Sequence, residues 1–109
     1  MSDFVIVLTT FPADGDAEQL ASRLVDERLA ACVNILPVMR SVYRWQGLVE
    51  RADERQLVIK TTNECVLGIE TLFRSLHPYD TPEFVVIPVQ RGSADYLAWI
   101  AENAQPAEP

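Results

Sequence analysis

Residues 32–61 read CVNILPVMRSVYRWQGLVERADERQLVIKT, and this stretch predicts a long β-hairpin. β-Branched and aromatic residues recur in both arms, as is typical of strands, and Gln46-Gly47 supplies a two-residue turn between them. Each arm holds about 13 residues and reaches roughly 40 Å at about 3.3 Å per residue. The polar segment Glu50–Arg55 is expected to face solvent on both sides, whereas residues 57–59 are expected in the core.

A strand and a helix precede the hairpin. Phe4–Thr10 begins with consecutive apolar residues and predicts a buried strand. The segment 12–15, Pro-Ala-Asp-Gly, ends that strand because proline and glycine mark turns. Asp16 then caps a helix, which carries its apolar residues on one stripe and runs to about Ala30.

A second helix and a fourth strand follow the hairpin. Thr62 or Asn63 is expected to cap the helix, which ends before Pro78 because the residue ahead of a proline avoids the helical region. The apolar run at residues 83–89 then predicts another strand.

A short third helix completes the predicted elements. Ser93 caps it, it runs through Ile100, and the tail from Glu102 is expected to fray. No internal repeat and no linker divides the sequence. Residues 1–109 are therefore expected to form a single domain.

The predicted order is β-α-β-β-α-β plus a terminal helix, which is the ferredoxin-like arrangement of an α+β sandwich. Its sheet order is 4-1-3-2, so the second and fourth strands lie at the edges. Proline belongs on edge strands or at bulges because it cannot donate to the ladder. Pro37 and Pro88 fall in those two predicted strands, and the other two contain none.

One face of this sheet is expected to lack helices, because right-handed crossovers place the first two helices on the other face. Yet residues 4–8 and 84–87 are apolar at consecutive positions, so each strand also presents apolar side chains to the open face. Exposing about half a dozen of them forgoes on the order of 10 kcal/mol, which is comparable with the stability of a whole domain. The hairpin also overhangs its neighbours and leaves a free strand edge. Both features predict a homo-oligomer.

The composition excludes several classes of function. A net charge of −7 argues against nucleic-acid binding, which requires clustered cations. No apolar run is long enough to span a membrane, and residues 1–8 do not form a signal peptide, so the cytoplasm is the expected location. Cys32 and Cys65 are too few for a zinc motif and are interpreted as buried thiols.

Five stretches of the sequence are informative when they are read together: residues 29–37, 41–47, 59–62, 77–83 and 96–100. Together they resemble the CutA divalent-cation-tolerance family. The resemblance implies a ferredoxin-like subunit in a tight homotrimer, similar to the PII signalling proteins. It also implies a role in tolerance to divalent cations, with copper or another divalent cation as ligand.

The resemblance implies metal ligands at three positions, a cysteine in the first strand and two adjacent histidines. Here these positions hold Thr9, Leu76 and His77, so His77 alone is retained. Cys32 is a candidate second ligand for Cu(I). The alternative for His77 is a histidine that closes a helix C-terminus, where the helix dipole favours it.

A second functional hypothesis is a PII-like sensor that binds a small molecule in clefts between subunits. Lys60, the only lysine, suits an anionic ligand or a carboxylate such as Glu83 or Glu54; the alternative is an edge lysine that extends to solvent. For the aromatic candidates, ordinary packing or a subunit interface is the favoured interpretation, and a ligand cleft is the alternative. The candidate cleft residues are Tyr43, Trp45, Lys60, Tyr79, Glu83 and Trp99.

An enzyme is not expected. The sequence has one histidine and no Ser/His/Asp or Cys/His pair at an informative spacing, which leaves little for acid–base or nucleophilic catalysis.

Overall fold

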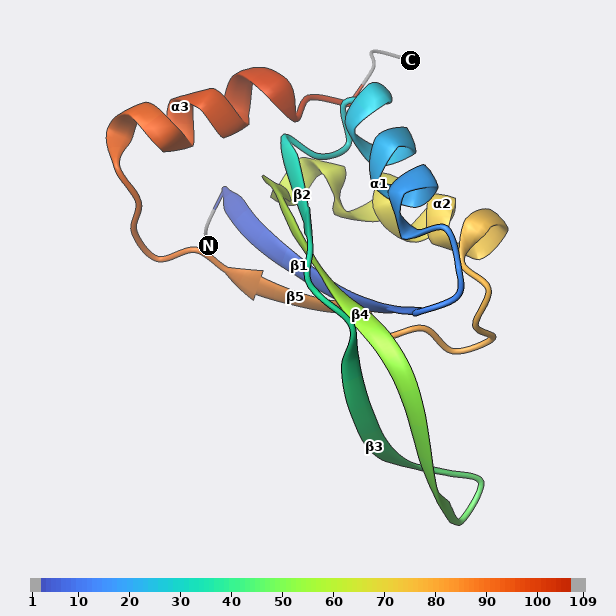
Figure 1. Ribbon diagram of the computed structural model, residues 1–109. Coiled ribbons are helices and arrows are strands. Elements are labelled where there is room, and N and C mark those ends of the chain that lie inside the picture. The colour runs from blue at the N-terminus through green and yellow to red at the C-terminus, as the bar shows by residue number, and fades with distance from the viewer. Residues whose placement is uncertain (1–2, 107–109) are drawn as a thin grey trace.

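The hairpin is the longest feature of the fold. The computed structural model describes residues 3–106, and in it β4 (Leu48–Thr62) pairs antiparallel with both β2 (Cys32–Ile35) and β3 (Met39–Trp45). The first predicted arm is thus divided in two around Pro37. Gln46 and Gly47 both have positive φ values, 51° and 83°, as a two-residue type I′ turn requires. Figure 1 shows β3 and the first half of β4 projecting away from the rest of the chain.

The sheet has the predicted strand order. β1 (Phe4–Pro12) is central and pairs antiparallel with β4 on one side and with β5 (Val85–Pro88) on the other. The order β2-β4-β1-β5 confirms the order 4-1-3-2 when β2 and β3 are taken as one interrupted strand. Pro37 lies in that interruption and Pro88 ends the edge strand β5, so neither proline removes a bond from the centre of the sheet.

Helix α1 (Ala17–Asp26) is shorter than predicted. The side chain of Asp16 accepts a hydrogen bond from the Gln19 amide at 3.0 Å, which confirms the predicted cap. At the other end Arg28 has a φ of 60°, a left-handed conformation that stops the helix before Ala30. The amides of Leu29 and Ala30 both return to the Leu24 carbonyl, at 2.9 and 3.1 Å.

Helix α2 (Val66–Leu76) begins with a 3₁₀ turn, η1 (Asn63–Cys65), in place of the predicted side-chain cap. The Thr62 hydroxyl is directed instead to Cys65 Sγ at 3.3 Å and to the Ala104 carbonyl at 3.2 Å. The helix ends at Leu76, ahead of Pro78, as predicted.

Helix α3 (Ala94–Asn103) is longer than predicted. The Ser93 hydroxyl accepts from the Tyr96 amide at 3.2 Å, which confirms its cap. Glu102 belongs to the helix, and Ala104 is buried against the core, so the tail does not fray where expected. The end of the predicted tail, residues 107–109, lies outside the described residues, as do residues 1–2. No helix within residues 3–106 is long and apolar enough to cross a membrane.

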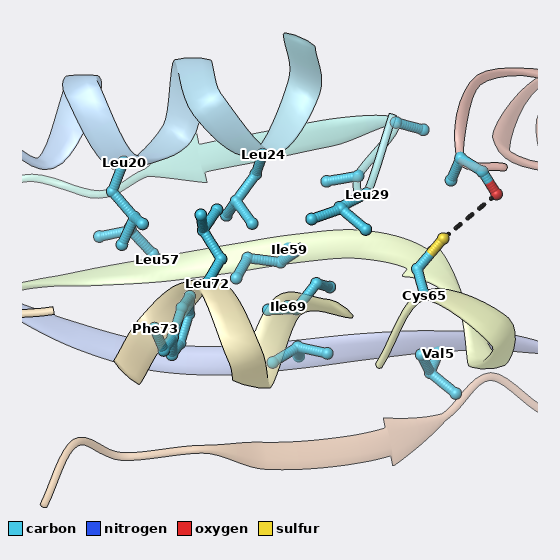
Figure 2. Packing of buried hydrophobic residues seen from close by; sticks show 14 of the residues in the cluster. Val5, Leu20, Leu24, Leu29, Leu57, Ile59, Cys65, Ile69, Leu72 and Phe73 are labelled. Atoms are coloured by element: carbon cyan, nitrogen blue, oxygen red, sulfur yellow. Dashed lines mark hydrogen bonds between the residues drawn. The ribbon is translucent and has the colours of Figure 1, made fainter. Parts of the chain in front are cut away.

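The hydrophobic core lies between the sheet and helices α1 and α2 (Figure 2). Alternate residues of β1 and β4 face these helices, because side chains alternate across a strand. Cys65 is fully buried there, and its thiol donates to the Ala104 carbonyl at 3.4 Å. Cys65 is thus the expected buried thiol, whereas Cys32 is only half-buried. Core residues labelled in Figure 2 include Val5, Leu20, Leu24, Leu57, Ile59, Ile69, Leu72 and Phe73.

The opposite face of the sheet, here called the open face, carries the other half of each strand. Leu8 pairs with Val85 and Ile6 with Ile87, so these four side chains lie on the face away from α1 and α2. Val85 is 46% exposed and Ile87 is 42% exposed. Helix α3 packs where β1 begins and β4 ends (Figure 1). The single chain therefore leaves much of its apolar sheet surface uncovered.

Candidate functional site

A cavity of about 630 Å³ lies on the open face, where the hairpin leaves the body of the sheet. The connection from α2 to β5 passes beside β4 (Figure 1). Its residues form one wall of the cavity. The other wall is formed by alternate residues of β3 and β4, which share one face of the hairpin because Met39 pairs with Glu54. The lining residues are Thr10, Met39, Ser41, Tyr43, Trp45, Glu54, Gln56, Pro78, Tyr79, Asp80, Thr81 and Glu83.

Glu54 and Tyr79 connect the two walls. The Tyr79 hydroxyl donates a hydrogen bond to Glu54 Oε2 at 2.7 Å. Burial, together with this hydrogen bond and the Glu54 charge, raises the pKa of the Tyr79 phenol well above its ordinary value, so the phenol stays protonated. Glu54 is only 7% exposed. The expectation that Glu50–Arg55 faces solvent on both sides is therefore wrong at Glu54, because the segment after α2 covers it.

Gln56 holds a second acidic residue at the cavity. Its side-chain nitrogen donates to the Thr9 carbonyl and to Glu83 Oε2, each at 2.8 Å. An amide nitrogen has two hydrogens, so it can make both bonds at once. Glu83 is therefore fixed relative to β1 and β4 although it lies in the connection ahead of β5.

His77 closes α2 and is buried beneath the connection. Its Nε2 lies 2.8 Å from the Thr10 carbonyl, and its Nδ1 accepts from the Tyr79 amide at 3.2 Å. A carbonyl only accepts, so the proton of the neutral ring is on Nε2. Burial lowers the pKa of His77, although the hydrogen bond to Thr10 and the Glu54 charge act in the opposite direction. Nε2 thus attaches His77 to β1, and Nδ1 holds the first residues of the connection against the same ring.

The candidate metal residues lie apart from each other. Cys32 begins β2 and pairs with Lys60, which in turn pairs with Ile6 near the start of β1. His77 contacts Thr10, near the end of β1. The Thr9 hydroxyl lies 3.2 Å from His77 Nε2, so these two positions, which the family resemblance pairs, are neighbours in space. Within residues 3–106, no group of three or more His, Cys, Asp or Glu side chains could hold a metal ion.

The six candidate cleft residues separate into two groups. Tyr43, Trp45, Tyr79 and Glu83 line the cavity, whereas Lys60 and Trp99 do not. The two remaining residues lie near Tyr96 of α3. Lys60 Nζ lies 5.8 Å from the centre of the Tyr96 ring, and the Tyr96 and Trp99 ring centres are 5.5 Å apart.

The carboxylate partners expected for Lys60 are not found. Glu54 accepts from Tyr79 and Glu83 from Gln56, and the ion pairs within the described part of the chain are Arg23–Glu27 and Arg40–Asp53.

Sequence reasoning missed Glu54, Gln56 and Asp80 as cavity residues. The hairpin register could have indicated Glu54 and Gln56, because a two-residue turn at Gln46-Gly47 fixes which residues share a face with Tyr43 and Trp45. Asp80 lies in the connection, whose path depends on the hydrogen bonds of His77 and Tyr79. No local pattern reveals those contacts.

Comparison with known proteins places these features in a family. The family model for the CutA1 divalent ion tolerance protein matches residues 5–103. The divalent-cation tolerance protein CutA of Thermus thermophilus is 45% identical over 98 residues, which cover 90% of this chain and 95% of the relative.

Solved structures agree with the sequence matches. CutA1 from Oryza sativa superposes with a TM-score of 0.91 at 33% identity, and the match covers 97% of each chain. The periplasmic divalent cation tolerance protein CutA from Archaeoglobus fulgidus gives a TM-score of 0.88 at 34% identity, covering 94% of this chain and 99% of that one. Since the family model spans most of the sequence and relatives match over nearly their whole length, this chain belongs to the CutA1 divalent ion tolerance protein family.

Proposed function

We propose that this protein contributes to tolerance of divalent cations as a homotrimer, in which the open face and the hairpin join the subunits. Family membership supports the cation-tolerance role. The number of subunits, three, is what the family resemblance implies. The observation that carries the assembly is the uncovered apolar surface of the single chain.

Apolar side chains are also exposed on both sides of the hairpin. Val85 and Ile87 are exposed on the open face, and Leu48, which pairs with Trp45, is more than half exposed on the same side of the hairpin. Val42 and Val49 are more than half exposed on the other side of the hairpin. Monomeric proteins rarely leave apolar patches of this extent in water. Within residues 3–106, β3 pairs with β4 alone, so its outer edge is free to pair with another chain.

The donor atoms of this chain do not fit a high-affinity copper site. High-affinity copper binding requires thiolate, thioether or several converging imidazoles. The ring nitrogens of His77 are both hydrogen-bonded, and a threonine stands where the family resemblance implies a cysteine. Copper would therefore bind weakly, in roughly the micromolar range or looser, and the role in tolerance would not depend on tight binding of this metal.

A small-molecule sensor is the second candidate function, and the cavity favours it. Ligand sites typically enclose about 300–1,000 Å³ and combine aromatic walls with a few polar groups. The cavity of about 630 Å³ lies within that range, and it carries Tyr43, Trp45 and Tyr79 beside the polar residues Glu54, Gln56 and Glu83.

A growth assay tests the tolerance role. A strain that lacks the gene should grow more slowly than its parent in elevated Cu(II) or Zn(II), and the wild-type gene should restore growth. An Ile87→Glu variant, which places a charge on the open face, should restore growth poorly. Leu67→Glu is the matched control, because Leu67 is 76% exposed on α2, away from the open face. Equal growth of all strains in both metals would contradict the proposal.

A further inference from the structure

We infer that the cavity between the hairpin and the connection from α2 to β5 binds an organic cation, such as a quaternary ammonium compound or a protonated amine. This inference names the ligand class for the sensor candidate and rests on it. All the residues that line the cavity belong to one chain, so a single chain can bind the ligand. In the proposed trimer a neighbouring subunit would border the cavity, because the cavity lies on the open face.

The charges that line the cavity are of one sign. Glu54, Asp80 and Glu83 contribute three carboxylates, and none of the described residues that line it is Lys, Arg or His. The chain as a whole carries a net charge of −7, so the wider field also favours a cation over an anion. The three carboxylates would repel a phosphate or carboxylate ligand, and no positive side chain among the described lining residues would offset that repulsion.

Glu54 supplies the strongest single indication. It is 7% exposed, yet it takes part in none of the ion pairs found in residues 3–106. Its bond from the neutral Tyr79 hydroxyl reaches only Oε2. Carboxylates buried to this degree are normally paired with a positive charge. A bound cation would supply the missing counter-charge.

Aromatic rings provide the other half of the site. Tyr43 and Trp45 are two residues apart on β3 and so project to the same side of the hairpin, and Tyr79 lines the cavity from the connection. Cations are attracted to the faces of aromatic rings, with Trp the strongest, and cages of aromatic rings bind quaternary ammonium groups. Carboxylates beside aromatic rings suit a ligand that has both a positive charge and an apolar surface.

A metal ion fits this site less well than an organic cation. A bare divalent ion needs several oxygen ligands that converge on one point. Within residues 3–106, no three acidic, His or Cys side chains are placed to do so, because Glu54 and Glu83 are held by different partners, Tyr79 and Gln56. The acidic groups are instead distributed along a cavity large enough for a molecule.

The test compares choline with 3,3-dimethylbutan-1-ol, which has the same shape with carbon in place of the charged nitrogen. Native mass spectrometry and calorimetry on the full chain should show choline binding at least about tenfold more tightly than the neutral alcohol. Glu54→Gln keeps the acceptor for Tyr79 and removes the charge, and it should weaken choline binding about tenfold. Glu64→Gln is the matched control, since Glu64 is exposed on η1 and its substitution changes the net charge by the same amount.

The ring contribution has its own pair of variants. Trp45→Leu should weaken choline binding about tenfold, because Trp45 lines the cavity, whereas Trp99→Leu should leave it unchanged. Circular dichroism on each variant confirms that it is folded. If Trp45→Leu is unfolded, Trp45→Phe replaces it, with a smaller loss expected from the weaker ring.

The outcomes separate the hypotheses. Equal binding of choline and the neutral alcohol would overturn the cation inference but leave the sensor candidate standing. Absence of saturable choline binding, or equal loss in Glu54→Gln and Glu64→Gln, would also overturn it. Zn(II) binding that Glu54→Gln abolishes, without choline binding, would assign the cavity to a metal. The same spectra report the assembly, so a monomer that binds choline would contradict only the proposed trimer.

Discussion

The hydroxyl of Tyr79 donates to the buried carboxylate of Glu54 at 2.7 Å, and this bond fixes the connection after α2 against the middle of the hairpin. His77 makes a second attachment of the same connection, from Nε2 to the Thr10 carbonyl. The shape of the cavity therefore depends on a small number of long-range polar contacts rather than on hydrophobic packing alone.

Replacing Tyr79 by Phe should reduce the free energy of unfolding by about 1–3 kcal/mol, because it leaves a buried carboxylate without its donor. Urea unfolding at a fixed protein concentration measures the change. Tyr96→Phe is the control, since Tyr96 is exposed on α3 and keeps its ring beneath Lys60. A Tyr79→Phe variant as stable as Tyr96→Phe would show that the hydrogen bond is of little importance.

Stability should fall on mild acidification because of His77. Its pKa in the folded protein is lowered from 6.5, so the unfolded chain binds the proton first as the pH falls. The contribution of His77 is fully present above about pH 6.5 and is lost as the pH falls toward the folded pKa. His77 is the only histidine, which allows an unambiguous NMR titration. An imidazole that titrates at or above pH 6.5 in the folded protein would contradict this prediction.

Thr9→Cys should raise the affinity for copper at least about tenfold, because thiolate and imidazole together suit this metal far better than one imidazole. The hydroxyl of Thr9 lies 3.2 Å from His77 Nε2, so the new sulfur would lie beside the ring. Thr61→Cys is the control, because Thr61 is equally buried but bonds to the Leu29 carbonyl instead. Chelator competition measures the copper affinity of both variants. Equal affinities would refute the prediction that positions 9 and 77 can share a copper ion.

Two substitutions at the hairpin turn should change the free energy of unfolding differently. Gly47→Ala should destabilise the protein by about 1 kcal/mol, because a φ of 83° strains a residue that has a Cβ atom. Gln46→Gly should be neutral or stabilising, since φ is also positive there. Unfolding midpoints of the two variants at one protein concentration check the pair, and a stabilised Gly47→Ala would exclude the type I′ turn.

Local patterns predicted the parts of the fold that depend on local chemistry. The turn at Gln46-Gly47 and the caps at Asp16 and Ser93 are set by residues within a few positions of each other. The strand order was predicted from the order of the elements, and Pro37 and Pro88 agreed with it, since both fall in the strands expected at the edges. These features could be read before any tertiary contact was known.

Features that depend on tertiary contacts could not be predicted. Helix α1 ends at a left-handed Arg28, a conformation that sequence patterns assign to glycine or asparagine. Glu54 is buried only because Tyr79 reaches it from 25 positions further along the chain. Lys60 lies over Tyr96 rather than beside a carboxylate because α3 reaches the end of β4. The candidate site was therefore predicted in part, through its aromatic residues and Glu83.

The molar mass in solution tests the central claim, that the open face joins three subunits. Light scattering at micromolar concentration should give three times the chain mass of 12.2 kDa for the wild-type protein and for Leu67→Glu. Ile87→Glu should shift the mass toward that of one chain, because the charge would be buried at the contact. A wild-type protein that remains at 12.2 kDa, or an Ile87→Glu variant with unchanged mass, would contradict the account.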